Sequence, residues 1–519
     1  MWFIVFGAAL VCGQSYVGQV DTVGGTTYDW WFNGPIHRDI VNSPNYGLHV
    51  SWMYSAETTG TTFIDRNMRY NFYDYVSSAW NWIDPDFMQS GVNVYAERSG
   101  CGNLAADLTT GVAYISRHGG TPQQSTVARD IVPGAGIFEF APGDTDLNGT
   151  GPVIAMGEGD RLHMVAMSSA YNMTYARMPT WPTWDTVMPL QGGLDYNIAA
   201  SKVSPKVFIC WTDNMSPVSR AYWRLSEDGG TTWGPQTELA APPAYGGDTV
   251  TSFHITSLFP FYDAHDHLHV AVNVIPVVHD TGNIMPAEIW HWGTYYDTTW
   301  SEIHRAGCAP EHLLGEVGYN ATYACRPSMG EDTSGNLFVV WEQFDSSNIE
   351  PLTGWLRASI WAAWSYSEYN GALWSPALRL TPPTSASHRF PCVIDRAQPD
   401  GSMWPATQVL YLMDPIAGFF VQDEHHGVRC PVVVQWPEFR DAIQDAPTPS
   451  PDTRLRIWPN PASQTLHIAG GQRLVLLDVA GRERARLHDG TNDIGTLPPG
   501  IYVVRDEQTR LSRKLVVRP

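Results

Sequence analysis

The residues best suited to hold a metal ion lie at 144–149, where the sequence reads Asp-Thr-Asp-Leu-Asn-Gly. Asp144, Asp146 and Asn148 place oxygen-bearing side chains on alternate residues, and the glycine that follows permits a tight turn. The glutamate that completes a helix-flanked calcium loop is missing, because Ala155 stands at the twelfth position. The spacing therefore predicts a loop-type calcium site, with a polar turn that holds no ion as the alternative.

A second cluster with metal-ligand chemistry lies at 265–269, which reads His-Asp-His-Leu-His. In a strand, His265, His267 and His269 would point to one face, where their imidazoles could converge on a metal. The alternative is a repeat, because an acidic turn followed by Leu-His also occurs at 160–163. We expect the repeat rather than the metal site.

Motifs for nucleophilic catalysis are missing from the sequence. There is no G-x-S-x-G, no H-E-x-x-H and no glycine loop that could cradle a phosphate. No C-x-x-C spacing occurs, so a thiolate zinc site is not expected. The acidic and imidazole groups of Asp-Glu-His-His at 423–426 are expected to form a solvated loop. No catalytic residue is assigned from the sequence.

Seven short runs of apolar, β-branched or aromatic residues recur along the body of the chain. Each is too short for a helix and has the composition of a β-strand. Short strands in groups of about four over roughly 400 residues are typical of a β-propeller, whose blades bury their faces by closing into a ring. We predict an all-β propeller with six or seven blades, and a multi-sheet sandwich is the alternative. The runs are 48–52, 112–115, 162–166, 207–211, 268–272, 337–341 and 409–412.

The most specific local motif of the body is S-E-D-G-G-T-T-W, which begins at Ser226. Asp228 can accept hydrogen bonds from the turn backbone, Gly230 can adopt a positive φ, and Trp233 can fold back between strands. Together with Thr232, these residues match the Asp-box, S-x-D-x-G-x-T-W, at every position. The body therefore resembles a sialidase-like propeller, a resemblance that concerns the fold rather than catalysis.

In that family, Asp-boxes lie on the rim opposite the active-site face, and hydrolysis uses an arginine triad, a tyrosine with a glutamate partner, and an aspartate. The resemblance implies such a site only where arginines gather at a central channel. Arg69, Arg177, Arg326 and Arg389 are candidates, and their spacing does not select three of them. The F-R-I-P-like segment of the family is not found. Arg326-Pro and Arg389-Phe-Pro are expected instead to open innermost strands.

The charge of the body limits its partners. The chain has 519 residues and a formal net charge of −21, whereas residues 454–519 carry +5, which leaves −26 for the rest. A body so acidic lacks the basic surface that nucleic acid binding needs. It suits a solvated extracellular protein and contact with cations. Aromatic residues make up 12% of the chain, which fits both sheet cores and sugar-facing surfaces.

Residues 1–13 are expected to be a signal peptide, because this apolar stretch is too short to span a membrane. Lipidation of Cys12 is a weaker alternative. No transmembrane helix is predicted, since no other stretch approaches 18 uninterrupted apolar residues. Six cysteines then remain in a chain bound for an oxidising compartment. We expect disulfides that join Cys308 to Cys325 and Cys392 to Cys430.

A polar, Pro-rich linker at 441–453 separates the body, residues 14–440, from a tail at 454–519. Short strands with Gly and Pro turns predict a small β-sandwich for the tail. Its motifs, W-P-N-P, D-x-x-G, L-x-x-G-I-Y and K-x-V-V, resemble in order and spacing those of the type A C-terminal sorting domain of type IX secretion. The motif residues are Pro459, Asn460, Pro461, Asp478, Gly481, Gly500, Tyr502 and Lys514.

The resemblance of the tail implies Sec export, passage through the type IX secretion machinery, and a location outside the cell or at its surface. It does not specify what the body does. We expect a non-catalytic module that binds a glycan or a protein through aromatic side chains and calcium-assisted loops. The alternatives are a divergent sialidase-like glycoside hydrolase and a structural surface-layer component. The enzyme requires converging carboxylates, or a Tyr-Glu pair with an Asp, beside clustered arginines, whereas the module requires an exposed aromatic patch.

Overall fold

The structure is a computed structural model, in which the chain divides into two compact units, residues 1–439 and 440–519. In the described part of the chain, no helix is long and apolar enough to cross a membrane. The predicted signal peptide and linker lie outside the described residues. The described residues are 15–518 except 33, 122, 143–148, 168–171, 191–192, 194, 214–219, 243–251, 279–280, 295–299, 398–405, 438, 440–454, 459–461, 479–481 and 507–511.

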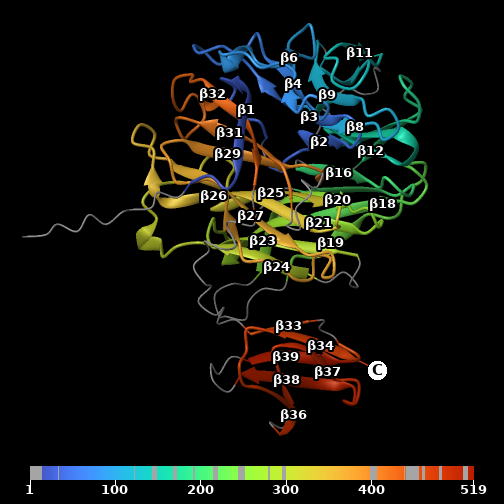
Figure 1. Ribbon diagram of the computed structural model, residues 1–519, viewed down its shortest axis with the longest axis vertical. Coiled ribbons are helices and arrows are strands. Elements are labelled where there is room, and N and C mark those ends of the chain that lie inside the picture. The colour runs from blue at the N-terminus through green and yellow to red at the C-terminus, as the bar shows by residue number, and fades with distance from the viewer. Residues whose placement is uncertain are drawn as a thin grey trace, which may run out of the picture. The chain divides into compact units, whose positions relative to one another are not determined.

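The described residues of the larger unit form seven mainly antiparallel sheets, each of four or five strands (Figure 1). The all-β prediction is confirmed. Each of the seven runs chosen from the sequence overlaps a long strand of a different sheet, namely β3, β9, β13, β17, β21, β26 and β31. The sheets are numbered here in the order in which these seven strands occur along the chain.

The first four sheets are built from strands that follow one another in the sequence. The first sheet contains β2 (Ile40–Ser43), β3 (Gly47–Tyr54), β4 (Asn67–Asp74), β5 (Ala79–Trp80) and β6 (Val92–Asn93). The second contains β7 (Ser99–Gly100), β8 (Leu104–Ala106), β9 (Ala113–Gly119), β10 (Gln124–Asp130) and β11 (Phe138–Phe140). The third contains β12 (Thr150–Gly157), β13 (Arg161–Met167), β14 (Met173–Met178) and β15 (Thr186–Leu190). The fourth contains β16 (Tyr196–Ala200), β17 (Val207–Thr212), β18 (Ala221–Ser226) and β19 (Thr237–Leu239).

The last three sheets include the two longest strand pairs and the N-terminal strand. The fifth contains β20 (Ser252–Tyr262), β21 (Leu268–Val278), β22 (Thr281–Gly282), β23 (Ala287–Gly293) and β24 (Trp300–Ala306). The sixth contains β25 (Ala324–Asp332), β26 (Leu337–Ile349), β27 (Leu356–Ser365), β28 (Leu378–Arg379) and β30 (Arg396–Ala397). The seventh contains β29 (Ser387–Val393), β31 (Val409–Asp414), β32 (Cys430–Trp436) and β1 (Gln19–Thr26). Single 3-10 turns occur at Phe87–Gln89 (η1), Glu158–Asp160 (η3), Pro310–His312 (η4) and Phe420–Gln422 (η5).

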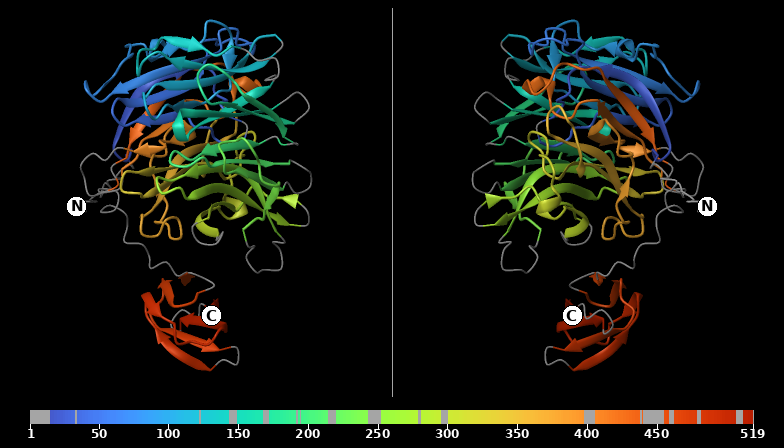
Figure 2. Two further views of the ribbon diagram at one scale, coloured as in Figure 1. Left: turned by 90° about the vertical axis from the view of Figure 1, so that its right-hand side faces the viewer. Right: turned by 90° about the vertical axis from the view of Figure 1, so that its left-hand side faces the viewer.

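The seventh sheet joins the two ends of the larger unit. Strand β1 pairs antiparallel with β32, so the dark-blue and orange ribbons lie side by side (Figures 1 and 2). Strands β2, β8, β12, β16, β20, β25 and β29 each contact the next in this series. The backbone N–H of Asn42 in β2 donates to Asp395, which follows β29, at 2.8 Å. The series of contacts therefore returns from the seventh sheet to the first.

Buried tryptophans occupy related places in three of the sheets. Trp52, Trp211 and Trp341 lie in the second strand of their sheets and are almost fully buried. Burial of about 200 Å² of tryptophan surface stabilises the fold by roughly 5 kcal/mol, an upper estimate because the unfolded chain is partly compact. Apolar, β-branched runs that end in tryptophan thus explain why these segments form interior strands.

The smaller unit has two antiparallel sheets around one apolar core. The core includes Leu466, Leu476, Tyr502 and Leu515, which come from both sheets. One sheet contains β33 (Arg456–Trp458), β34 (Thr465–Ala469) and β37 (Gly490–Asp493). The other contains β35 (Leu474–Asp478), β36 (Glu483–Leu487), β38 (Gly500–Asp506) and β39 (Ser512–Val517).

The contact between the seventh and first sheets depends on a glycine. A Cβ atom at Gly24, in β1, would lie 2.1 Å from the ring of Trp52, in β3. We expect Gly24→Ala to lower the free energy of unfolding by about 1–3 kcal/mol, because a buried indole has no room to move aside. The control is Gly307→Ala, whose Cβ would meet its nearest neighbour at 3.4 Å. Urea denaturation of the full chain should show a loss for the first variant and little change for the second.

Candidate functional site

The chain between β1 and β2, residues 27–39, must pass from the seventh sheet to the first. We call it the connecting segment. Near its start, Asp29 accepts hydrogen bonds from the backbone N–H groups of Phe420 and the next residue, in η5. Near its end, the carbonyl oxygen of Ile36 accepts a bond from the side-chain amide of Asn197, in β16. Because β16 belongs to the fourth sheet, the segment is held both by that sheet and by the loop that follows β31 of the seventh sheet.

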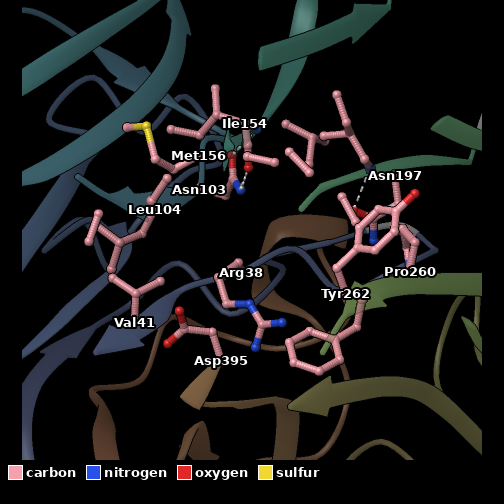
Figure 3. A pocket seen from close by; sticks show the side chains of 18 of the residues that line it. Arg38, Val41, Asn103, Leu104, Ile154, Met156, Asn197, Pro260, Tyr262 and Asp395 are labelled. Carbon is pink, nitrogen blue, oxygen red and sulfur yellow. Dashed lines mark hydrogen bonds between the residues drawn. The ribbon is translucent and has the colours of Figure 1, made fainter. Parts of the chain in front are cut away.

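Arg38 of the connecting segment points into a small cavity among the first strands of the sheets (Figure 3). Its guanidinium donates to the carbonyl oxygens of Val393 and Met329, at 2.6 and 2.8 Å. Asp395, in the same cavity, forms an ion pair with Lys202 at 2.5 Å. The cavity measures about 80 Å³.

A larger cavity of about 230 Å³ lies beside the connecting segment. This volume is slightly below the range of about 300–1,000 Å³ that is typical of small-molecule sites. Strand starts form part of its wall, because Thr150 opens β12 and Tyr196 opens β16. We call it the aromatic cavity. Side chains that line it include Tyr28, Trp30, Trp31, Phe32, His118 and Asp195.

The aromatic cavity and the Asp-box turn lie at opposite edges of the sheets. Strand β16 starts at the cavity with Tyr196 and ends at Ala200, which pairs with Val207 of β17. Val207 also pairs with Ser226, the first residue of the Asp-box. The turn therefore lies at the end of β16 that is remote from the cavity.

One wall of the aromatic cavity has positive charge behind it. His118 Nε2 lies 3.2 Å from a guanidinium nitrogen of Arg66, which is buried and also lies over the ring of Tyr28. Burial and nearby arginines, Arg66 first among them, lower the pKa of His118 to about 3, so its ring is neutral. Neither Arg66 nor Arg98, which is exposed nearby, forms an ion pair with a carboxylate in the described chain.

The other wall holds one carboxylate, Asp195. Burial raises its pKa to about 6, and the distant charge of Arg326 opposes the shift only in part. Within the described residues its carboxylate has no side-chain hydrogen bond. A Cβ atom on Gly34 would lie 2.3 Å from Asp195 Oδ1, so the glycine lets the connecting segment pass close to this group. A carboxyl group that titrates near neutrality in a cavity is suited to proton transfer or to pH-dependent binding.

Two of the four candidate arginines come together, and they do so around an acid. Arg326 and Arg389 lie in the first strands of their sheets, β25 and β29, as the sequence indicated. Both form ion pairs with Glu342, and the exposed fractions of the three side chains are 1%, 1% and 0%. This buried triad leaves no space for a substrate carboxylate. Arg69 and Arg177 lie elsewhere, since Arg69 donates to backbone oxygens after η1 and Arg177 pairs with Asp185.

The Asp-box turn is held by Asp228. Its carboxylate accepts hydrogen bonds from the backbone N–H of Thr231 and Thr232 and from the hydroxyl groups of Ser226 and Thr232. The bonds from Thr232 are the largest cause that lowers the pKa of Asp228 to about 2. Gly230 has a φ of +80°, which favours glycine.

The Asp-box also ties the fourth sheet to the third. The ring of Trp233 packs edge to face on that of Tyr175, in β14, with centroids 4.8 Å apart. A guanidinium nitrogen of Arg177 donates to the carbonyl oxygen of Gly229 at 3.0 Å. Trp233 therefore contacts the neighbouring sheet rather than lying only between strands of its own.

The histidines at 265–269 do not converge on one point. His267 and His269 both contact Asp263, at 2.9 and 3.4 Å, whereas His265 stacks on His267. His269 is buried in the second strand of its sheet, as His163 is in β13. The predicted calcium ligands Asp144, Asp146 and Asn148 lie outside the described residues, so that site stays a prediction.

The expected disulfides are not formed, because all six described cysteines are free. Cys392 and Cys430 lie in β29 and β32, which are separated in the seventh sheet by β31. Two strand spacings, about 9.6 Å, exceed the reach of a disulfide. Cys308 follows β24 of the fifth sheet, whereas Cys325 lies near the start of β25 in the sixth sheet. Cys325 Sγ lies 3.3 Å from a carboxylate oxygen of Glu342. The disulfide prediction is wrong since sequence spacing did not show this strand order.

Half of the tail motif residues can be described. Asp478 is buried and forms ion pairs with Arg482 and Arg484. The hydroxyl of Tyr502 donates to the carbonyl oxygen of Pro498 at 2.8 Å. In the backbone, Gly500 pairs with Val517 and Lys514 with Val503 across β38 and β39. Pro459, Asn460, Pro461 and Gly481 lie outside the described residues.

Comparisons with known proteins give distant similarities only in structure. No family model matches the chain, and no curated protein matches it. An ulvan lyase of a polysaccharide lyase family, bound to -[GlcA(1-4)Rha3S]-, is 13% identical, with 82% of this chain and 100% of that chain covered and a TM-score of 0.48. A lectin from Burkholderia pseudomallei is 12% identical, with 79% and 99% covered and a TM-score of 0.41. A neuraminidase-like protein from A/bat/Guatemala is 7% identical, with 66% and 89% covered and a TM-score of 0.38.

The residues of the aromatic cavity were not selected from the sequence. The dense aromatic run at 28–32, Tyr-Asp-Trp-Trp-Phe, was a usable signal, because so many rings in a connection between strands need a partner surface. His118 and Asp195 stand alone in the sequence, and only the fold brings them to the same cavity.

The buried triad gives a test of stability. Glu342→Gln removes the negative charge between two buried guanidinium groups, and we expect the free energy of unfolding to fall by about 3–5 kcal/mol. Glu139→Gln is the control, because its pair with Arg129 is half-exposed and should contribute about 0–1 kcal/mol. Denaturation of the full chain at neutral pH would compare them, and equal losses would contradict the role of the triad.

The same carboxylate predicts a pH dependence. The neighbouring arginines, Arg389 first, hold the pKa of Glu342 at about 2, below the ordinary 4.5, although burial opposes them. A lowered folded-state pKa means that this stabilisation is present above pH 4.5 and is lost as pH falls toward 2. The stability difference between the wild type and Glu342→Gln should therefore shrink over that range. A difference that does not change with pH would contradict the assignment.

Proposed function

We propose that the larger unit is a seven-bladed, sialidase-like propeller on the outside of the cell, and that its aromatic cavity binds an acidic carbohydrate. The proposal of an acidic ligand rests on an aromatic wall with two arginines behind it, Arg66 and Arg98, which form no ion pair with a carboxylate in the described chain. Three observations support a closed ring of blades: seven successive sheets, the pairing of β1 with β32, and the return of contacts from the seventh sheet to the first.

The aromatic wall supports a sugar ligand. Tyr28, Trp30 and Trp31 offer flat apolar rings, while His118 and Asp195 supply polar groups in the same cavity. A mainly apolar cavity with a few directed polar groups is typical of small-molecule sites, and ring faces suit the C–H faces of sugars. Trp30 is only partly buried, so it is accessible to a ligand.

The arginines support an acidic sugar over a neutral one. Arg66 and Arg98 lie close enough to His118 to contribute to its lowered pKa. Both guanidinium groups donate to backbone carbonyl oxygens and form no ion pair with a carboxylate in the described chain, so their positive charge favours a carboxylate or sulfate nearby. This local charge opposes the sign of the chain as a whole, whose net charge is −21.

Binding without turnover is the function that the site supports best. Hydrolysis of a glycoside needs two carboxylates, or a Tyr-Glu pair with an aspartate, and the described lining residues contain one carboxylate, Asp195. The buried arginines that could have formed a substrate-binding triad are paired with Glu342. A glycoside hydrolase remains the second candidate, because the raised pKa of Asp195 suits a general acid.

We also propose export by the type IX secretion machinery, with Sec transport first and a signal peptide at 1–13. The support is the order and spacing of the tail motifs, together with a separate compact unit at the C-terminal end of the chain. Calcium at Asp144, Asp146 and Asn148 is kept in the proposal as a stabiliser of a loop, on the sequence pattern alone. Deletion of 454–519 in a host with this machinery should leave the body between the two membranes, whereas the full chain should appear outside the cell.

Affinity for acidic and neutral oligosaccharides would test the ligand. We expect uronate or sulfated oligosaccharides to bind the full chain at least tenfold more tightly than neutral ones, in calorimetry at fixed salt. Arg98→Gln should weaken this binding about five- to tenfold, or roughly 1–1.4 kcal/mol, and its melting temperature is measured as well because Arg98 also donates to the carbonyl oxygens of Phe63 and Thr62. The control is Arg220→Gln, an exposed arginine of the fourth sheet. Equal affinity for the two classes, or no effect at Arg98, would rule out the acidic ligand.

Asp195 makes the binding depend on pH. Its pKa is raised to about 6, so the group is charged at pH 7.5 and mostly neutral at pH 5. Because a charged carboxylate repels an acidic ligand, we expect affinity to rise several-fold as pH falls from 7.5 to 5, where a uronate is still ionised. Asp195→Asn should bind with little dependence on pH. Tighter binding at high pH would contradict this prediction.

Product analysis would test whether the aromatic cavity also catalyses cleavage of its ligand. Incubation of the wild type and Asp195→Asn with acidic polysaccharides, followed by measurement of new reducing ends and of unsaturated products, separates the two functions. No product with either protein supports the binding module. Product that depends on Asp195 would instead make the larger unit an enzyme.

A further inference from the structure

Three groups with metal-ligand chemistry meet outside the aromatic cavity. They come from separate parts of the chain: Asp29 from the connecting segment, Asp414 from the end of β31, and His425 from the loop after η5. One ligand atom of each lies within 4.8 Å of those of the other two, and all three residues are buried. His425 Nε2 lies 3.4 Å from Asp29 Oδ2.

The histidine is oriented as a metal ligand is. His425 Nδ1 lies 2.8 Å from the carbonyl oxygen of His426, so Nδ1 carries the proton that it donates. Nε2 is buried, makes no well-formed hydrogen bond in the described chain, and faces the two aspartates at 3.4 Å from Asp29 Oδ2, so a metal ion bound there would replace the proton on Nε2. A backbone carbonyl that fixes the other ring nitrogen is a common feature of metal-bound histidine.

The charge of the cluster also calls for a cation. Glu424 adds a third carboxylate beside His425, and it accepts a hydrogen bond from the backbone N–H of Phe419. Arg389, a nearby cation, is already paired with Glu342. Asp29 and Asp414 are both buried and hold carboxylate oxygens within 4.8 Å of each other, so their negative charges repel. Buried carboxylates that repel one another in this way need a proton or a metal ion to balance them.

We propose that Asp29, Asp414 and His425 bind one divalent transition-metal ion, with zinc as the best match. Mixed imidazole and carboxylate ligands suit zinc, whereas calcium takes six to eight oxygen ligands. Zinc bonds of about 2.0–2.2 Å place ligand atoms roughly 3.3–3.6 Å apart, so the widest pair must close by about 1 Å. Cys430 Sγ, 3.7 Å from Asp414 Oδ1, is the nearest additional donor.

The ion would fix the connecting segment to the seventh sheet. Asp29 stands between Tyr28 and Trp30, which line the aromatic cavity, while Asp414 and His425 belong to the seventh sheet and its loop. A shared ion therefore joins the start of the aromatic wall to the strand that supports it. The metal-site proposal does not depend on whether the aromatic cavity binds carbohydrate.

Zinc titration of the full chain would test the site. The protein is stripped with EDTA, returned to excess calcium so that oxygen-rich loops are saturated, and titrated with zinc while metal content and melting temperature are measured. We expect one tightly held zinc per chain and a rise of about 3 °C. Asp414→Asn and His425→Gln should lose both effects. The matched control is His426→Gln, because this neighbouring histidine is exposed.

A second measurement needs no variant, in case either substitution prevents folding. Cobalt added to the stripped wild type should give the visible bands of a low-coordinate imidazole-carboxylate complex, and one equivalent of zinc should remove them. Absence of stoichiometric zinc and of these bands would overturn the proposal. Zinc binding that is equal in the wild type and in folded His425→Gln would overturn it as well, since the ion would then lie elsewhere.

Discussion

The pairing of β1 with β32 is the constraint on which the rest of the larger unit depends. Because the first strand of the chain completes the last sheet, the chain must then travel to the first sheet before β2 can begin. Residues 27–39 make that passage, and they carry the rings of the aromatic cavity, the Asp29 carboxylate and the Arg38 side chain. One topological choice thus places three chemically different groups near the centre of the unit.

Two buried charge clusters on this part of the molecule are balanced in different ways. Around Glu342, two arginines satisfy one carboxylate, and the three side chains form a closed network. Around Asp29, two buried carboxylates share one imidazole, whose Nε2 lies 3.4 Å from Asp29 Oδ2 without a well-formed hydrogen bond. Similar burial therefore gives a rigid structural element in the first case and a place for an added cation in the second.

The sequence was a good guide to features that depend on neighbouring residues. The seven strand runs were predictable because apolar, β-branched residues between polar turns favour interior strands, and each run lies in a separate sheet. The Asp228 turn was predictable for the same reason, since its hydrogen bonds span only four residues. The packing of Trp233 was less predictable, because its partner Tyr175 lies in another sheet.

Features that depend on distant residues were missed. His118 and Asp195 share a cavity although 77 residues separate them in the sequence, and Asp29 meets Asp414 across almost the whole larger unit. The disulfide pairs failed for a related reason, because spacing along the chain does not show that β31 lies between β29 and β32. Lone titratable residues acquire a role only through strand order, which local composition does not encode.

The late completion of the seventh sheet also has a kinetic consequence. A chain that emerges with its N-terminus first holds β1 without its neighbour until residues 430–436 have followed, more than 400 residues later. Contacts between such distant segments form slowly, and an unpaired strand is a site for aggregation in the interval. The exposed Gln19 and the partly exposed Asp21 in the first half of β1 keep the edge of this strand polar until β32 pairs with it. A chain with this connectivity can complete the seventh sheet only after residues 430–436 are free to reach β1.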